Sequence, residues 1–198
     1  QVIVDANDPE VQKPKKFIGK RYLKKEALEL SKLFNWTIKE QETDLWRRVV
    51  PSPMPQYIMH GKSIRSLVEK KTIASGGGGI PVYNNNEGYL SGLDAVVDKD
   101  YTAAKMGHII RAQELWIITD VDNVYKNFGT KKQEPVFSMT ADEAKKLYEE
   151  DYFQEGSIGP KIKAALHFLK HRGDKVVITS IACVKDALNG QAGTEIRN

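Results

Sequence analysis

The stretch that decides the fold covers residues 98–119 and has the sequence DKDYTAAKMGHIIRAQELWIIT. Residues 98–110 are predicted to form a helix, and the acidic side chains at its start suit the positive end of a helix dipole. Residues 114–119 are rich in apolar and β-branched side chains, as in a buried strand. A helix that leads into such a strand is typical of an α/β fold with a largely parallel sheet.

The alternation of helices and strands continues on both sides of this stretch. Thr140 and Glu143 have the spacing of a capping box, which predicts a helix over residues 140–150. Pro160 suits the first position of a helix that runs to Lys170. We also predict helices over residues 24–33, 58–70 and 184–188, and strands over residues 2–4, 46–50, 72–75 and 175–179.

The composition is ordinary for a globular protein of 198 residues, with 40% hydrophobic and 28% charged residues. The net charge of +4 is spread along the chain, and without a basic stripe we expect no nucleic-acid partner. No apolar stretch is long enough for a membrane span, so we expect no membrane partner either. The single cysteine, Cys183, excludes an intramolecular disulfide and predicts a buried, inert thiol in a cytoplasmic setting.

Four glycines, Gly76, Gly77, Gly78 and Gly79, follow the predicted strand 72–75. Ligands of open α/β sheets bind beyond the carboxyl ends of the strands, where this loop is expected to lie. The sequence is neither a Walker A loop nor a dinucleotide-binding fingerprint, because neither pattern continues after the glycines. A flexible turn and an anion-binding loop both fit, and the four consecutive glycines favour anion binding.

Two lysines stand at predicted helix starts, where a positive charge opposes the helix dipole. Lys99 lies between Asp98 and Asp100, which are compatible both with simple helix capping and with a phosphate site. Lys161 is predicted to be the second residue of its helix, directly after the sequence GSIGP at residues 156–160. With no acidic neighbour in sequence, Lys161 indicates a bound phosphate at that helix start.

The sequence TDVDNVY at residues 119–125 follows the predicted strand 114–119. Asp and Asn make polar turns, so this segment is compatible with a simple turn. It is equally compatible with the rim of a nucleotide site, where carboxylates bind ribose hydroxyls or a metal and Tyr125 and Phe128 contact adenine. None of the four histidines has metal-ligand spacing, and we predict no metal-binding residues.

Together these segments resemble the amino acid kinase family and, within it, the carbamate kinases. The resemblance runs over essentially the whole chain, and WRRVVPSP and DKD are its most specific parts. The segments that carry it are NDP at 7–9, WRRVVPSP at 46–53, GGGGIPV at 76–82, GLDAVVDKD at 92–100, TDVDNVY at 119–125, NFG at 127–129, GSIGPK at 156–161 and AGT at 192–194.

The resemblance implies a three-layer α/β/α sandwich with a mainly parallel sheet. It also implies a small protruding subdomain over residues 5–53, with the nucleotide-binding part of the kinase domain over residues 54–198. The implied activity is a cytoplasmic phosphotransferase of arginine catabolism, a homodimer that uses ATP/ADP and Mg²⁺. It would move a phosphoryl group reversibly between carbamoyl phosphate and ADP, giving ATP and carbamate.

The resemblance also assigns roles to individual residues. Lys99 and Lys161 match the lysines that neutralise the moving phosphoryl group, and Asp100 matches the carboxylate that orients both. Lys16 matches the subdomain lysine that reaches carbamoyl phosphate, and the glycines Gly76–Gly79 face the carbamate. The nucleotide-binding positions are Thr119, Asp120, Tyr125, Phe128 and Ile158, the last in place of a usual methionine.

One departure from the family pattern concerns its beginning. Family members start with a strand, a Gly-Gly-Asn phosphate loop and a Gly-Asn-Gly-Pro segment, which this sequence does not contain. We therefore expect it to correspond to the last two thirds of such a protein and to be inactive by itself. Two other readings stay open: a related kinase acting on another acid, and a degenerate, non-catalytic relative.

Overall fold

The computed structural model describes residues 1–71, 76–153 and 158–198. The predicted strand 72–75, and Gly156 and Ser157, lie outside the described residues. The chain packs into two units, one made of residues 1–59 and 77–98 and the other of residues 60–76 and 99–198. Among the described residues, no helix is long and apolar enough to cross a membrane.

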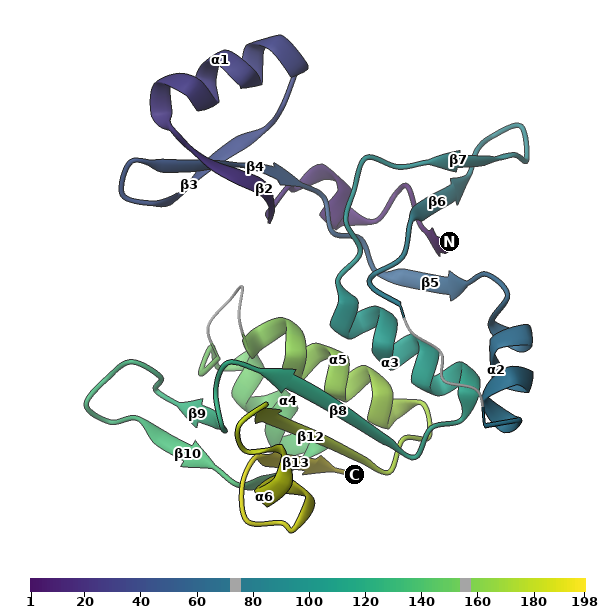
Figure 1. The fold of residues 1–198 in the computed structure, drawn as a ribbon, viewed down its shortest axis with the longest axis vertical. Helices are drawn as coiled ribbons and strands as arrows, with labels where there is room; N and C mark the ends of the chain where they lie inside the picture. The colour runs from purple at the N-terminus through teal and green to yellow at the C-terminus, as the bar shows by residue number, and fades with distance from the viewer. Residues whose placement is uncertain (72–75, 154–157) are drawn as a thin grey trace. The chain divides into compact units, whose positions relative to one another are not determined.

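The C-terminal unit is built on a four-stranded sheet, drawn in green and yellow in Figure 1. Its strands lie in the order β11 (Ser138–Thr140), β13 (Thr194–Arg197), β12 (Lys175–Ser180) and β8 (Glu114–Thr119). The β11–β13 and β12–β8 pairs are parallel, and the β12–β13 pair is antiparallel. Strand β12 is buried along almost its whole length, as expected for a central strand covered on both faces.

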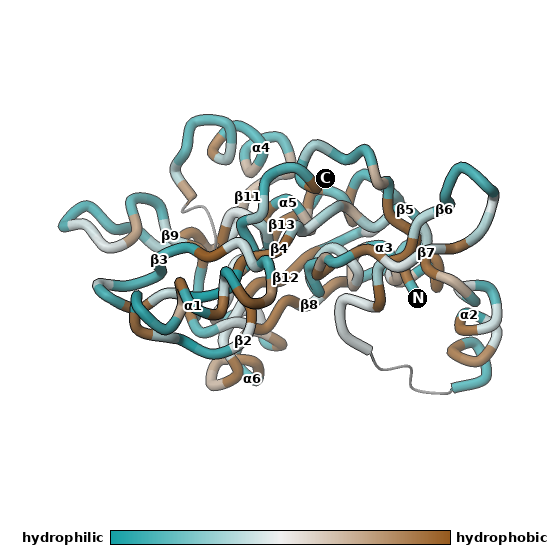
Figure 2. Tube along the Cα trace, turned by 90° about the horizontal axis from the view of Figure 1, so that it is seen from above, coloured by the Kyte–Doolittle hydropathy of each residue, from teal (hydrophilic) through white to brown (hydrophobic). Residues whose placement is uncertain are grey.

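Helices cover both faces of this sheet. The helices of the unit are α2 (Gly61–Glu69), α3 (Lys99–Ile110), α4 (Ala141–Glu149), α5 (Ile158–Lys170) and α6 (Val184–Leu188). Figure 2 shows α4 to one side of strands β8 and β12 and the short helix α6 to the other side. This arrangement confirms the predicted α/β sandwich.

Helices α3 and α5 approach each other closely, and one glycine makes this possible. A Cβ atom added to Gly107 of α3 would lie 2.7 Å from Cε2 of Phe168 on α5. Phe168, Ile162 and Leu169 of α5 are almost fully buried in the core of the unit. The two helices are therefore held against each other by close packing, which fixes the residues at their first turns.

The N-terminal unit contains a second four-stranded sheet, in the order β5 (Pro55–Ile58), β1 (Val2–Val4), β6 (Pro81–Asn84) and β7 (Leu90–Gly92). Only the β1–β6 pair of this sheet is parallel. Gly79 has a left-handed φ of +84°, and an added Cβ would lie 2.3 Å from Val2. Glycine is therefore required where the chain enters β6.

The same unit contains a three-stranded antiparallel sheet in the order β2 (Lys16–Leu23), β4 (Leu45–Val50) and β3 (Ile38–Glu42). Helix α1 (Lys24–Phe34) connects β2 to β3 and contacts these strands. A 3-10 turn at Pro9–Gln12 is capped by the carboxylate of Asp8. The predicted subdomain boundary at residue 53 stays a prediction.

Most predicted elements are confirmed, including the strand at residues 114–119 and the capping box of Thr140 and Glu143. The predicted helix start at Ile58 was wrong, because Ile58 pairs with Val2 in β5 and the helix begins at Gly61. The predicted helix start at Pro160 was also wrong. Helix α5 already includes Ile158, so Lys161 is its fourth residue. Cys183 is half-buried, not fully buried as predicted.

Candidate functional site

The candidate site begins with one carboxylate between two lysines. Lys99 Nζ lies 2.8 Å from Asp100 Oδ1, and Lys161 Nζ lies 3.4 Å from Asp100 Oδ2. Lys99 and Asp100 are the first two residues of α3, while Lys161 belongs to the first turns of α5. The packing of α3 on α5 therefore brings together three residues that sequence analysis named as catalytic.

The electrostatics of this cluster explain why lysines occur at helix starts. A cation is unfavourable at the positive end of a helix dipole unless an anion accompanies it. For Lys161 the sequence offered no neighbouring acid, and the structure supplies Asp100 from the adjacent helix. The side chains of Asp100 and Lys161 are 10% and 14% exposed, whereas that of Lys99 is 66% exposed. Lys99 is therefore the lysine that can turn toward solvent or a ligand.

The carboxyl end of strand β8 contributes a second acid to the site. Asp120 directly follows the strand, and its Oδ1 accepts a hydrogen bond of 2.9 Å from the hydroxyl of Thr119. This hydrogen bond, above all, holds the pKa of Asp120 below its usual value, and the positive charge of Lys161 contributes in the same direction. Asp120 is thus an anion at neutral pH and a neighbour of the lysine cluster.

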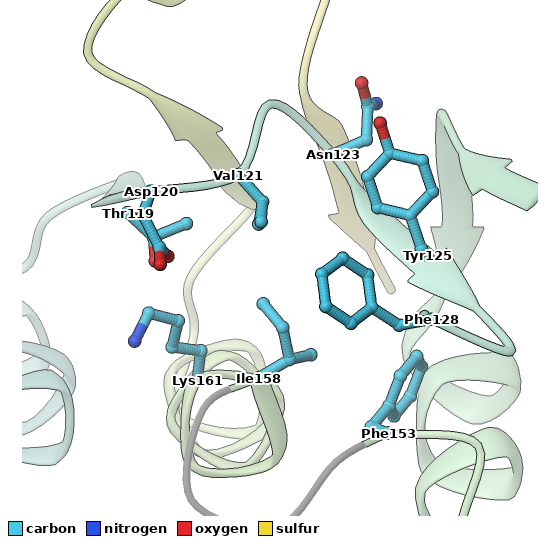
Figure 3. Close-up of a pocket in the computed structure, with 9 residues that line it drawn as sticks. All are labelled: Thr119, Asp120, Val121, Asn123, Tyr125, Phe128, Phe153, Ile158 and Lys161. Atoms are coloured by element: carbon cyan, nitrogen blue, oxygen red, sulfur yellow. The ribbon is translucent and has the colours of Figure 1, made fainter. Parts of the chain in front are cut away.

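A pocket of about 260 Å³ lies at this strand end. Small-molecule pockets begin at about 300 Å³, so its size suits a part of a ligand. Figure 3 shows Lys161 and Asp120 at one end of the pocket and the rings of Tyr125, Phe128 and Phe153 at the other. The lining residues are Thr119, Asp120, Val121, Asn123, Tyr125, Phe128, Phe153, Ile158 and Lys161.

The aromatic end is formed largely by a hairpin of two short strands, β9 (Val124–Lys126) and β10 (Glu134–Val136). The ring centroids of Tyr125 and Phe128 lie 6.0 Å apart. The Tyr125 hydroxyl donates a hydrogen bond of 2.7 Å to Asp122 Oδ1, which raises the pKa of Tyr125 above its ordinary value. The ring of Tyr125 is thereby oriented while its phenol stays protonated.

The remaining predicted site residues are Lys16 and the four glycines at positions 76–79. All of them except Gly76 belong to the N-terminal unit. Lys16 of β2 donates a hydrogen bond of 2.6 Å to Asp98 Oδ2. The side chain of Asp98 is 11% exposed and that of Lys16 is 40% exposed, so the ion pair is partly shielded from solvent. Added Cβ atoms at Gly76 and Gly77 would meet no atom within 4 Å, whereas Gly79 is needed for its backbone conformation. Among the described residues, Lys161 and all five predicted nucleotide-binding positions line the pocket, whereas the predicted catalytic residues Lys99 and Asp100 do not.

Three of the residues that line the pocket were not predicted from the sequence. Val121 and Asn123 lie within the TDVDNVY segment, so that segment was the available signal. Phe153 follows helix α4 in a stretch without a recognisable pattern. Only the folded chain places its ring in the pocket.

The C-terminal unit is an α/β sandwich, and its pocket lies at the carboxyl end of a strand, where open α/β sheets bind their ligands. The amino acid kinase family profile matches residues 24–180. The chain belongs to the amino acid kinase family.

Individual relatives can be compared over almost the whole chain. The carbamate kinase of Pyrococcus horikoshii is 40% identical over 99% of this chain, and that of Thermoplasma acidophilum is 43% identical over 99%. The solved structure of Giardia lamblia carbamate kinase bound to AMP-PNP is 34% identical, with a TM-score of 0.85, and the match covers 100% of this chain. The chain spans 63%, 64% and 63% of these three relatives, respectively.

Proposed function

We propose that this chain is the larger part of a carbamate kinase, which transfers a phosphoryl group between carbamoyl phosphate and ADP. The observation that carries the proposal is that one end of the pocket is charged and the other end is aromatic. Its lysine end suits phosphate groups, and its aromatic end suits a nucleobase. The similarity to carbamate kinases supports carbamate as the second product.

In the proposed reaction, the bond between phosphorus and the bridging oxygen of carbamoyl phosphate breaks. Carbamate leaves with that oxygen, and an oxygen of the ADP β-phosphate forms the new bond to phosphorus. Such transfers need positioning and charge neutralisation more than covalent catalysis. Lys161 and Lys99, both held by Asp100, supply two positive charges for the oxygens of the moving group.

The aromatic end orients the nucleotide. Tyr125 and Phe128 offer apolar ring surfaces to adenine. Ile158 lies between these rings and Lys161. Lys16 and the glycines at positions 76–79 are proposed to bind the carbamoyl phosphate end. Their support is the match to the family motifs.

Mg²⁺ is proposed as the accompanying ion of the nucleotide. Within the described ranges, no group of three or more His, Cys, Asp or Glu side chains is placed to hold a metal. Mg²⁺ usually keeps waters and binds one or two carboxylates together with substrate phosphates. Asp120 is the carboxylate that would hold it, and the ion would neutralise phosphate charge.

The cellular setting follows from the same family resemblance. We propose a cytoplasmic homodimer that recycles ADP to ATP during arginine catabolism. Light scattering on the purified gene product would measure its mass in solution. A mass of one chain at micromolar concentration would contradict the dimer and leave the proposed chemistry untouched.

A coupled assay that measures ATP formation from ADP and carbamoyl phosphate tests the proposed activity. The full-length gene product should form ATP, and Lys161→Ala should lower kcat by about 10²–10³-fold because one preorganised charge is lost. Lys163→Ala is the matched control, since Lys163 lies on the same helix with its Nζ 4.8 Å from the ring of Tyr148. That control should keep wild-type kcat.

The other outcomes separate the rival functions. ATP formation with acetyl phosphate but not with carbamoyl phosphate would indicate a kinase acting on another acid. Absence of ATP formation with every acyl phosphate, in a folded protein, would indicate a non-catalytic relative. Unchanged turnover in Lys161→Ala would contradict the proposed role of that lysine.

A further inference from the structure

The aromatic end of the pocket is attached to the C-terminal strand through one buried hydroxyl group. Thr194, the first residue of β13, is fully buried. Its Oγ1 accepts a hydrogen bond of 2.7 Å from the backbone N–H of Val124 and donates one to the carbonyl of Val136. Val124 and Val136 are opposite each other in the hairpin. One side chain therefore bridges both strands at the hairpin base.

A second side chain reinforces this attachment from the pocket side. The Nδ2 group of Asn123 donates hydrogen bonds of 2.7 Å to the carbonyl of Gly193 and 3.3 Å to that of Val136. Asn123 is itself buried and directly precedes β9. The segment Gly193–Thr194 and the hairpin are thus joined by hydrogen bonds that the low local dielectric strengthens.

We propose that Thr194 is a positioning residue that sets the affinity of the pocket for the nucleobase. It acts through Val124 on the hairpin that carries Tyr125 and Phe128, and it does not contact the pocket itself. The phosphate end is held separately, by α3, α5 and Asp100. Loss of the Thr194 hydroxyl should therefore weaken nucleobase binding and leave phosphate binding and the chemical step unchanged.

This inference rests on the proposed nucleotide site, so its experiment measures binding and turnover separately. Thr194→Val keeps the shape of the side chain and removes the hydroxyl, whereas Thr194→Ser keeps the hydroxyl. Calorimetry on the full-length gene product would give the Kd of ADP and the Kd of pyrophosphate, which has no base. We expect Thr194→Val to raise the Kd and KM for ADP about tenfold, with Kd for pyrophosphate and kcat within about twofold.

The conservative variant distinguishes positioning from general destabilisation. Thr194→Ser should retain a Kd for ADP within about threefold of wild type, since its hydroxyl can make both hydrogen bonds. A Thr194→Val protein that binds ADP as tightly as wild type would overturn the inference. Equal losses for ADP and pyrophosphate would overturn it too, because they would indicate a structural effect on the whole pocket.

Hydrogen exchange on the wild-type protein keeps the inference testable if Thr194→Val does not fold. Saturation with ADP should slow exchange of the Val124 amide, whereas pyrophosphate should not. If the Val124 amide exchanges at the same rate with and without ADP, the proposed link between Thr194 and nucleobase binding would be contradicted. Absence of ADP binding by the wild-type protein would contradict the proposed function itself, which is a different result.

Discussion

The two ends of the pocket are built in different ways. The charged end stands on α3 and α5, two helices of 12 and 13 residues that pack closely at Gly107 and Phe168. The aromatic end stands on a hairpin of two three-residue strands. Side-chain hydrogen bonds from Asn123 and Thr194 attach this hairpin to the neighbouring strand. Dense packing positions one end, and a few hydrogen bonds position the other.

This difference indicates that the two ends serve different tasks, charge stabilisation at one end and nucleobase recognition at the other. Charge stabilisation in a transition state requires groups that do not move when the charge develops, and packed helices provide them. Nucleobase recognition by aromatic rings tolerates small adjustments, so a hairpin is sufficient. Changes at the helices should therefore act on kcat or on stability, and changes at the hairpin should act on nucleotide affinity.

Asp100→Asn should have the largest effect, because it removes the negative charge that holds both lysines. The variant keeps the size of the side chain but loses both ion pairs. We expect kcat in the coupled assay to fall by about 10²-fold or more. The KM for ADP should change by less than about threefold.

Asp142→Asn is the control for this variant. Asp142 is an exposed acid in the first turn of α4, a position comparable to that of Asp100 in α3. It should keep wild-type kcat. An Asp100→Asn enzyme with normal kcat and a raised KM would show that the charged end serves binding, and the contrast between the ends would be lost.

Gly107→Ala tests whether close packing fixes the charged end. The added methyl group would be 2.7 Å from the ring of Phe168, so the ring or the two helices must shift. We expect a loss of about 1–3 kcal/mol in the free energy of unfolding, measured with urea. Gly92→Ala is the control, because an added Cβ there meets no atom within 4 Å. Equal stability of wild type and Gly107→Ala would contradict this packing.

Phe128→Ala should have a smaller effect, limited to nucleotide binding. Loss of one ring from the aromatic end should raise the Kd for ADP by about tenfold, because stacking of a base on an aromatic side chain contributes about 1–3 kcal/mol. Phe137→Ala is the control, since Phe137 is exposed and does not line the pocket. A fall in kcat without a change in Kd for ADP would argue against an aromatic base site.

The smallest expected effect concerns the pH dependence of the protein's stability, which His167 of α5 should influence. Burial, followed by the nearby charges of His171 and Lys105, lowers the pKa of His167 to about 4. The unfolded chain takes up this proton near pH 6.5, so the unfolded state is favoured progressively as pH falls from 6.5 toward 4. His167→Gln should therefore reduce the loss of Tm between pH 7 and pH 5.

A control variant outside this histidine group is His60→Asn. The side chains that face His167 are those of Lys105 and His108 on α3, Lys170 on α5, and His171, whose ring centroid lies 4.4 Å away. His60 is not among them, so His60→Asn should leave the loss of Tm between pH 7 and pH 5 unchanged. If Tm falls as much between pH 7 and pH 5 in His167→Gln as in the wild type, other groups control the pH dependence of Tm.

The sequence was sufficient for those elements whose signals are local. The apolar run at residues 114–119 and the Thr140–Glu143 capping box predicted β8 and the start of α4 correctly. Ile58 was misplaced because its structure depends on pairing with Val2, more than fifty residues earlier in the chain. Local pattern cannot report such a pairing, and tertiary contacts override propensity there.

The candidate site shows the same limit. Lys99 and Lys161 were recognisable because a lysine at a helix start opposes the helix dipole. That Asp100 serves both lysines depends on the packing of α3 on α5. The pairing of Lys16 with Asp98, the ring of Phe153 in the pocket and the hydroxyl of Thr194 behind it are likewise products of the fold.

The most direct test of the two-ended pocket is a crystal structure of the full-length gene product with a non-hydrolysable ATP analogue. We predict that the phosphates lie beside Lys161 and Asp120 and that adenine contacts Tyr125 or Phe128. An analogue bound in the opposite direction, or outside this pocket, would contradict this prediction.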